Sequence, residues 1–239
     1  IGWDIGGLEV IDCADESETA ARAVQLAREG GVDSLMKGHI HTDVFMGAIV
    51  NRETGLRTDR RLSHVFHMSV PDSDRVLMIT DAAVNIAPDV ITKQQIILNA
   101  VDMAHALGIA CPHVAILSAT EEVNPRMPSS VEAAELSDWA GEYVSDALVH
   151  GPLAFDNALS PDAAALKGVE HPVAGNADIV VVPNIETGNA LFKNLVYCNS
   201  ACAAGVVLGA TVPIVLTSRA DPPVARLASI AVATILSQS

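Results

Sequence analysis

Aromatic residues are scarce in this 239-residue chain, making up 3% of it, while half of the residues are apolar. Ala, Val, Ile and Leu must therefore fill most of the interior, as is typical of parallel strands buried under helices on both faces. Uninterrupted apolar runs of the roughly 20 residues needed to span a membrane are also lacking. The longest apolar stretch, 201–216, contains Gly205, Gly209 and Pro213, and we predict a helix, a turn and a buried strand there.

No charged segment followed by a small-residue cleavage site opens the sequence, so we expect a cytoplasmic protein without a secretion signal. Basic residues are few, since 14 Lys and Arg stand against 29 Asp and Glu, for a formal net charge of −15. Such a field repels nucleic acid and anionic membranes, so neither is expected as a partner. Any site for an anionic ligand must gather the few basic residues locally, which makes each basic cluster informative.

The common metal and nucleotide motifs are missing. The four cysteines contain no CxxC pair. We interpret Cys198 and Cys202, one helical turn apart, as small core residues, with half of a zinc site as the alternative. His39 and His41 form an HxH pair with no third ligand placed by the pattern, so no metal is expected. A Walker A motif, a glycine-rich dinucleotide fingerprint and a G-x-S-x-G elbow are absent, which disfavours nucleoside triphosphates and a Rossmann-type NAD site.

What is present is an alternation of short apolar runs with amphipathic segments. We predict strands at 8–13, 34–36, 64–68, 76–79, 114–117, 179–182 and 212–216. We predict helices at 16–28, 92–107, 131–144, 161–167, 188–197 and 223–237. Strand–helix alternation of this kind indicates an α/β fold with a largely parallel sheet.

The segment 217–221 is the sharpest candidate site. Ligands of open parallel sheets bind beyond the carboxyl ends of strands, where loops lead into helices. Here a buried strand leads to Ser218 and Arg219, and Asp221 is predicted to cap a helix that starts with proline. The helix N-terminus and the guanidinium suit a phosphoryl or carboxylate group. A surface salt bridge of Arg219, with Ser218 as a cap, is the alternative.

Two other polar groups are candidates, and the first follows a predicted strand. Asn189 and Lys193 are four residues apart and share one helical face, where an amide and an ammonium could hold a phosphate or a carbonyl oxygen. The densest basic cluster lies at 57–61, where Arg57 and Thr58 are followed by two further arginines. A solvated surface is the alternative interpretation of both groups.

These segments resemble the phosphate acetyl/butyryltransferase family, and more closely its butyryl branch. The motifs that carry the resemblance run in the family's order through nearly the whole chain: LMKG at 35–38, GLRT at 55–58, SHV at 63–65, ITDAAVN at 79–85, GPLAFDNA at 151–158, PVAGNAD at 172–178 and PNIETGN at 183–189, followed by Lys193 and the pair Ser218-Arg219. Two features depart from the family pattern. The sequence begins late, without the opening strand–helix units, and Ala225 stands where the acetyl branch has an aspartate.

The resemblance implies two α/β domains with a cleft between them, in the architecture of isocitrate and isopropylmalate dehydrogenases. Residues 1–66 with 206–239 would form one domain and 67–205 the other. It further implies conversion of a short-chain acyl-CoA and phosphate to acyl phosphate and coenzyme A, without any cofactor beyond these substrates, by a homodimer or larger homo-oligomer.

On this hypothesis, the catalytic residues are Ser218, Arg219 and Asp221. Five further residues bind the substrates: Lys37, Arg57, Thr58, Asn189 and Lys193. Two alternatives stay open, a decarboxylating dehydrogenase of the same architecture and a non-catalytic module that binds acyl-CoA or an anion.

Overall fold

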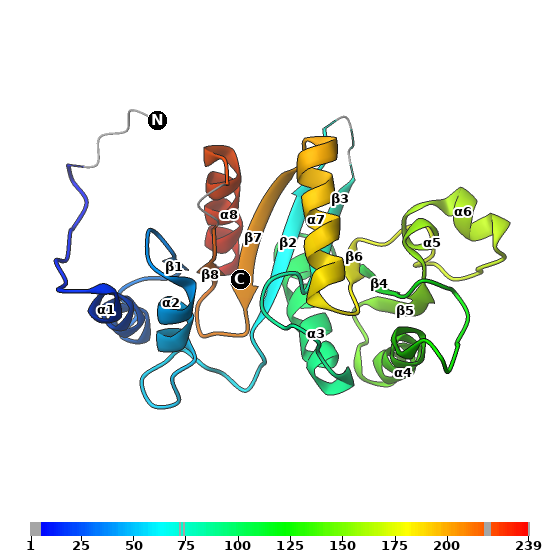
Figure 1. Ribbon diagram of the computed structural model, residues 1–239, viewed down its shortest axis with the longest axis horizontal. Coiled ribbons are helices and arrows are strands. Elements are labelled where there is room, and N and C mark those ends of the chain that lie inside the picture. The colour runs from blue at the N-terminus through cyan, green and yellow to red at the C-terminus, as the bar shows by residue number, and fades with distance from the viewer. Residues whose placement is uncertain (1–5, 72, 74, 218–220, 239) are drawn as a thin grey trace.

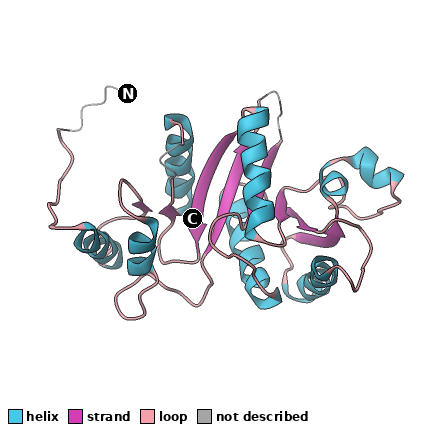
Figure 2. Cartoon of the chain, viewed as in Figure 1, coloured by secondary structure: helices cyan, strands magenta, loops and turns pink. Residues whose placement is uncertain are grey.

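The computed structural model describes residues 6–71, 73, 75–217 and 221–238. Eight strands and eight helices alternate along this part of the chain (Figures 1 and 2). The strands are β1 (Leu35–Met36), β2 (Ser63–Ser69), β3 (Val76–Thr80), β4 (His113–Leu117), β5 (Leu148–Leu153), β6 (Ile179–Val181), β7 (Cys202–Leu208) and β8 (Ile214–Val215). The helices are α1 (Glu16–Arg28), α2 (Thr42–Ile49), α3 (Val90–Ala106), α4 (Pro128–Tyr143), α5 (Phe155–Leu159), α6 (Pro161–Leu166), α7 (Ile185–Asn199) and α8 (Pro223–Leu236).

All eight strands form one sheet in the order β1-β8-β7-β2-β3-β6-β4-β5. The sheet is parallel at its two ends, where β1 pairs with β8 and where β3, β6, β4 and β5 pair in turn. Its middle is antiparallel, because β7 pairs antiparallel with both β8 and β2, and β2 with β3. The predicted α/β class is therefore confirmed, while the sheet is mixed rather than largely parallel.

Helices cover the sheet on both faces. One buried cluster joins α3, α4 and the last turns of α8 to strand residues such as Val65 and Val206. A second cluster, on the other face, joins α5, α6 and α7 to Met68 and Ile79. A third packs α1 and α2 against β1, β8 and Val207. Aliphatic side chains dominate all three, as the scarcity of aromatic residues predicts.

Several predicted elements need correction. Residues 8–13 form no strand; Leu8 and Val10 are 69% and 89% exposed, so this apolar alternation has nothing to pack against. The start of the stretch 201–216 is strand β7 rather than the predicted helix. The structure also contains β5, α2 and α5, which are not predicted from the sequence. The proposed domain boundaries at 66/67 and 206 fall inside β2 and β7. The division into two domains stays a prediction.

Local sequence signals explain where helices begin. Asp15 accepts a hydrogen bond from the backbone N–H of Glu18 at 2.8 Å, and the Glu18 carboxylate accepts from that of Ala14 at 2.6 Å. Asn184 caps α7 by accepting from the backbone N–H of Thr187 at 3.0 Å.

No helix among the described residues is both long and apolar enough to cross a membrane.

Candidate functional site

A groove of about 260 Å³ lies between α7 and α8, beside the edge of β7. In Figure 1, α7 crosses in front of the sheet and α8 stands next to β7. Three segments supply the residues of the groove: Phe66 of β2; Asn189, Phe192, Lys193, Val196 and Tyr197 of α7; and Ala201, Ala203, Gly205, Leu216, Asp221, Pro222, Ala225 and Ser229 of the chain from β7 to α8.

Asn189 and Lys193 line one wall of this groove. The buried strand β6 leads into α7, and the two residues lie on consecutive turns of this helix. Asn189 is half-buried and Lys193 is exposed, so the groove offers an amide near its wall and an ammonium at its rim. The sequence prediction that these two side chains share a face of one helix is confirmed.

Described residues of the segment between β8 and α8 also line the groove. These are Leu216, which precedes residues 218–220, and Asp221, which follows them. The predicted catalytic residues Ser218 and Arg219 lie outside the described residues. The prediction that Asp221 caps α8 is wrong, because Pro222 is the N-cap residue and Pro223 begins the helix. Asp221 nevertheless lines the same groove as Lys193 and Asn189.

Lys37 follows β1 and lies next to the start of this segment, since Thr217 Oγ1 donates to its carbonyl oxygen at 3.4 Å. Lys37 as a whole is 6% exposed. The ammonium donates to the carbonyl oxygens of Ile40 at 2.9 Å and Gly38 at 3.2 Å. Lys37 therefore supports the loop that follows β1, and it does not line the groove.

Arg57 and Thr58 lie elsewhere. The backbone of Arg57 forms an isolated antiparallel β-bridge with Ala210. Thr58 Oγ1 donates a hydrogen bond to the carbonyl oxygen of Gly209 at 2.8 Å. Gly209 follows the last residue of β7, whereas Ala201 and Ala203, at the other end of that strand, line the groove. Within one chain, the structure does not bring the 57–61 cluster to Asn189 and Lys193.

The floor of the groove contains aromatic rings that the sequence pattern does not single out. Phe66 stacks on Phe192 with centroids 4.1 Å apart, and His64 lies against Phe66 at 4.2 Å. His64 is 1% exposed, and burial lowers its pKa to about 4, against the opposing pull of the nearby Asp81 carboxylate. No local sequence signal gives these rings, because they meet through the pairing of β2 with β7 and the packing of α7.

Ala225 also lines the groove, so no carboxylate stands at this position. Next to it, the Ser229 hydroxyl donates to the Ala225 carbonyl oxygen at 2.8 Å and accepts from the backbone N–H of Gly205 at 2.9 Å. The second of these bonds ties α8 to the edge of β7. Among the described residues, no group of three or more His, Cys, Asp and Glu side chains could hold a metal ion.

Taken together, the mixed sheet and the groove define an α/β protein with a polar site where a strand leads into a helix. The family model for phosphate acetyl/butaryl transferase matches residues 12–234. The chain therefore belongs to this family.

Named relatives agree with that assignment. The chain is 52% identical over 233 residues to a phosphate acetyltransferase of Rhizobium meliloti, a match that covers 97% of this chain and 74% of the relative. It is 42% identical over 237 residues to a phosphate butyryltransferase of Clostridium acetobutylicum, a match that covers 99% of this chain and 79% of the relative. These identities do not favour the butyryl branch that the motifs suggest.

Solved structures show the same fold. A branched-chain phosphotransacylase from Enterococcus faecalis superposes with a TM-score of 0.89 at 38% identity, covering 95% of this chain and 82% of that one. A putative 4-hydroxythreonine-4-phosphate dehydrogenase from Salmonella typhimurium superposes with a TM-score of 0.54 at 16% identity, covering 92% of this chain and 69% of that one. The second likeness concerns the fold alone, and it agrees with the dehydrogenase-like architecture expected from the sequence.

Proposed function

We propose that this chain is a phosphate acyltransferase, which moves a short acyl group between coenzyme A and inorganic phosphate. Family membership over residues 12–234 and relatives of both acetyl and butyryl name support the activity. The observation that supports the groove between α7 and α8 as its site is a convergence of polar groups. There, Asn189, Lys193 and Asp221 line one groove in a molecule with a net charge of −15, and Asp221 lies two residues after Arg219 in the sequence.

The reaction needs no covalent intermediate on the protein. A phosphate oxygen attacks the thioester carbonyl carbon, the C–S bond breaks, and coenzyme A leaves as a thiolate that takes up a proton. In reverse, the thiolate attacks the acyl phosphate and phosphate leaves. Binding both substrates in one orientation and stabilising the developing negative charge account for most of the acceleration.

Each of the five proposed site residues has a defined task in this scheme. Lys193 and Asn189 hold the phosphate oxygens, while Arg219 carries the phosphoryl charge and Ser218 donates to the carbonyl oxygen or the thiolate. Asp221 exchanges a proton with the thiol, because Ala225, which also lines the groove, has no carboxylate. The thiol ionises near pH 8.5 in isolation, so a base helps without being indispensable. Arg57, Thr58 and Lys37 do not line this groove, and the scheme does not depend on them.

Three further features belong to the same proposal. The substrates suffice, with no resident cofactor. The chain works in the cytoplasm as a homodimer or larger homo-oligomer, as the family resemblance suggests. Two domains flank the groove, which is supported by the separate core that α1, α2, β1 and β8 share.

The test is release of free thiol from acetyl-, propionyl- and butyryl-CoA, each with and without phosphate. We expect thiol release that requires phosphate, and the preferred acyl group is the one turned over with the highest kcat/KM. Arg219→Ala should lower kcat by about 10²–10³-fold, as loss of an oxyanion donor does. Arg126→Ala, at an exposed position that does not line the groove, is the matched control. Thiol release that ignores phosphate would contradict the proposal, and tight acyl-CoA binding without turnover would favour the non-catalytic module.

A further inference from the structure

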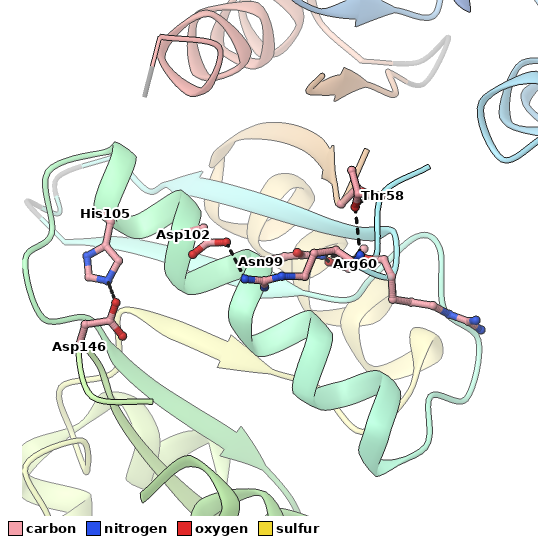
Figure 3. Close-up of polar contacts among 9 residues, drawn as sticks. Thr58, Arg60, Asn99, Asp102, His105 and Asp146 are labelled. Atoms are coloured by element: carbon pink, nitrogen blue, oxygen red, sulfur yellow. Dashed lines mark hydrogen bonds and ion pairs between the residues drawn. The ribbon is translucent and has the colours of Figure 1, made fainter. Parts of the chain in front are cut away.

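A second pocket, of about 340 Å³, lies at the far end of β7 from the groove. Three segments frame it: the loop that carries Thr58 to Arg60, the middle of α3, and the β7–β8 turn from Gly209 to Pro213. Figure 3 shows Arg60 reaching over α3 toward Asn99 and Asp102. None of these residues has a task in the proposed acyl transfer.

Hydrogen bonds hold the frame of the pocket in place. Thr58 Oγ1 accepts from the backbone N–H of Arg60 at 3.0 Å and donates to the Gly209 carbonyl oxygen at 2.8 Å. Asn99 Nδ2 donates to the Arg61 carbonyl oxygen and to Ser63 Oγ, both at 2.8 Å. The loop, the turn and α3 are thereby fixed relative to one another, so the pocket is preformed.

The Arg60 guanidinium is incompletely satisfied. Its Nη2 lies 3.5 Å from Asp102 Oδ2, which is long for a charge-assisted hydrogen bond. Its Nη1 is covered and finds no acceptor among the described residues. A charged donor without an acceptor is unfavourable, so a small rotation of the partly exposed Arg60 side chain toward an oxygen of a ligand in the pocket would be favourable.

Two aspartates line the pocket together with Arg60. The Asp102 side chain is 65% exposed, and Asp59 also lines the pocket. Burial raises the pKa of Asp102, and the neighbouring Asp146 adds to that effect, while Arg60 and His105 oppose it. The carboxylate therefore gains from a further positive charge. His105 is not available for this, because its Nε2 lies 3.1 Å from Asp146 Oδ2 (Figure 3).

One positive and two negative groups on one rim disfavour ligands of a single charge. An anion drawn to Arg60 meets Asp59 and Asp102, and a cation drawn to these meets Arg60. A ligand whose carboxylate and ammonium are neighbours satisfies both, since the opposite charges of Arg60 and Asp102 are also neighbours. Apolar side chains complete the lining: Met103, Leu208, Val212 and Leu236.

From this juxtaposition we propose that the pocket between α3 and the β7–β8 turn binds an α-amino acid with an aliphatic side chain. Its carboxylate pairs with Arg60, its ammonium with Asp102 and Asp59, and its side chain contacts the apolar lining. The site lies apart from the acyl-transfer groove and does not depend on the proposed function.

The test is isothermal titration of the purified chain with L-leucine. The control ligands are 4-methylpentanoate, which lacks the ammonium, 3-methylbutylamine, which lacks the carboxylate, and inorganic phosphate. We expect saturable binding of L-leucine and affinities lower by about tenfold or more for each control ligand. Arg60→Ala and Asp102→Asn should each weaken L-leucine binding by about tenfold or more, with Arg60→Gln as a second variant should Arg60→Ala not fold.

The neighbouring Arg61→Ala serves as the matched control, because Arg61 is exposed and does not line the pocket. It should bind L-leucine like the wild type. The proposal is overturned by absence of saturable L-leucine binding, by equal affinity for 4-methylpentanoate, or by undiminished binding in folded Arg60→Ala and Arg60→Gln.

Discussion

Gly205 is the position where one added methyl group tests the packing beneath the groove. It pairs with Phe66 in the middle of the β2–β7 ladder. A Cβ at this position would lie 2.8 Å from His64 Nε2, 2.9 Å from His64 Cε1 and 3.0 Å from Phe66 Cε1. Neither ring can yield easily, because His64 is buried and Phe66 is stacked on Phe192. The strand must therefore move, or both rings must shift into the groove.

Gly205→Ala should consequently destabilise the protein. Overpacking of a filled interior costs about 1–3 kcal/mol. For a chain of this size, each kcal/mol lowers Tm by roughly 2–4 °C, so a decrease of roughly 2–12 °C is expected. Displacement of Phe66 should also lower kcat/KM for the acyl-CoA, because that ring forms part of the groove. Thermal unfolding followed by circular dichroism measures the first effect and thiol release the second.

Gly47→Ala is the matched control for this substitution. Gly47 lies within α2, and among the described residues no neighbouring atom lies within 4 Å of the place that a methyl group would occupy. Alanine is favoured over glycine inside a helix by about 0.5–1 kcal/mol, so this variant should be as stable as the wild type or more stable. If Gly205→Ala proved as stable as Gly47→Ala, the packing described for His64 and Phe66 would be refuted.

Three further predictions follow from single side chains. Lys193→Ala should raise KM for phosphate by about tenfold or more in the thiol-release assay, and Lys193→Arg should raise it less. An unaltered KM for phosphate in Lys193→Ala would show that Lys193 is not part of the site. Glu132→Gln removes the carboxylate partner of Lys93, which is only 3% exposed. We expect the free energy of unfolding in urea to fall by roughly 1–3 kcal/mol, less than for a fully buried pair because Glu132 is one-third exposed. An unchanged urea midpoint would show that the pair contributes little to stability. The pKa of His64 is lowered to about 4 in the folded protein, so its neutral form contributes stability that is present above pH 6.5 and lost as the pH falls from 6.5 toward 4. Between pH 7 and pH 5, the wild type should therefore lose roughly 2 kcal/mol more of its free energy of unfolding in urea than His64→Asn, and an equal acid sensitivity of both proteins would contradict this.

Much of the fold can be predicted from periodicity and capping. The helix at 16–28 is predicted with its observed bounds, because Asp15, Glu18 and the glycine pair after it are strong signals. The prediction for strand β7 is wrong because its sequence, CAAGVVL, is small and apolar throughout and shows neither the helical nor the strand period. Strand β2 runs antiparallel to both of its neighbours, and no local signal reports that direction.

The site can be predicted only in part. Asn189 and Lys193 are predictable because helical spacing places them on one face, and Asp221 because it lies beside the β8–α8 segment. The 57–61 cluster is predicted at the same site from its charge and from the family resemblance, although its position depends on the β7–β8 turn, a contact made across about 150 residues of sequence. Phe66 and Phe192 meet in the groove only through pairing of β2 with β7 and packing of α7, which spacing does not encode.

Acyl transfer to and from phosphate at the groove between α7 and α8 is the central claim. The most direct measurement is thioester formation from acyl phosphate and coenzyme A by the wild type, Lys193→Ala, Arg219→Ala and the control Arg126→Ala. We expect stoichiometric thioester and phosphate with the wild type and the control, and strongly reduced rates with Lys193→Ala and Arg219→Ala. Folded wild-type protein that forms no thioester, or rates of these two variants that match the wild type, would contradict the claim.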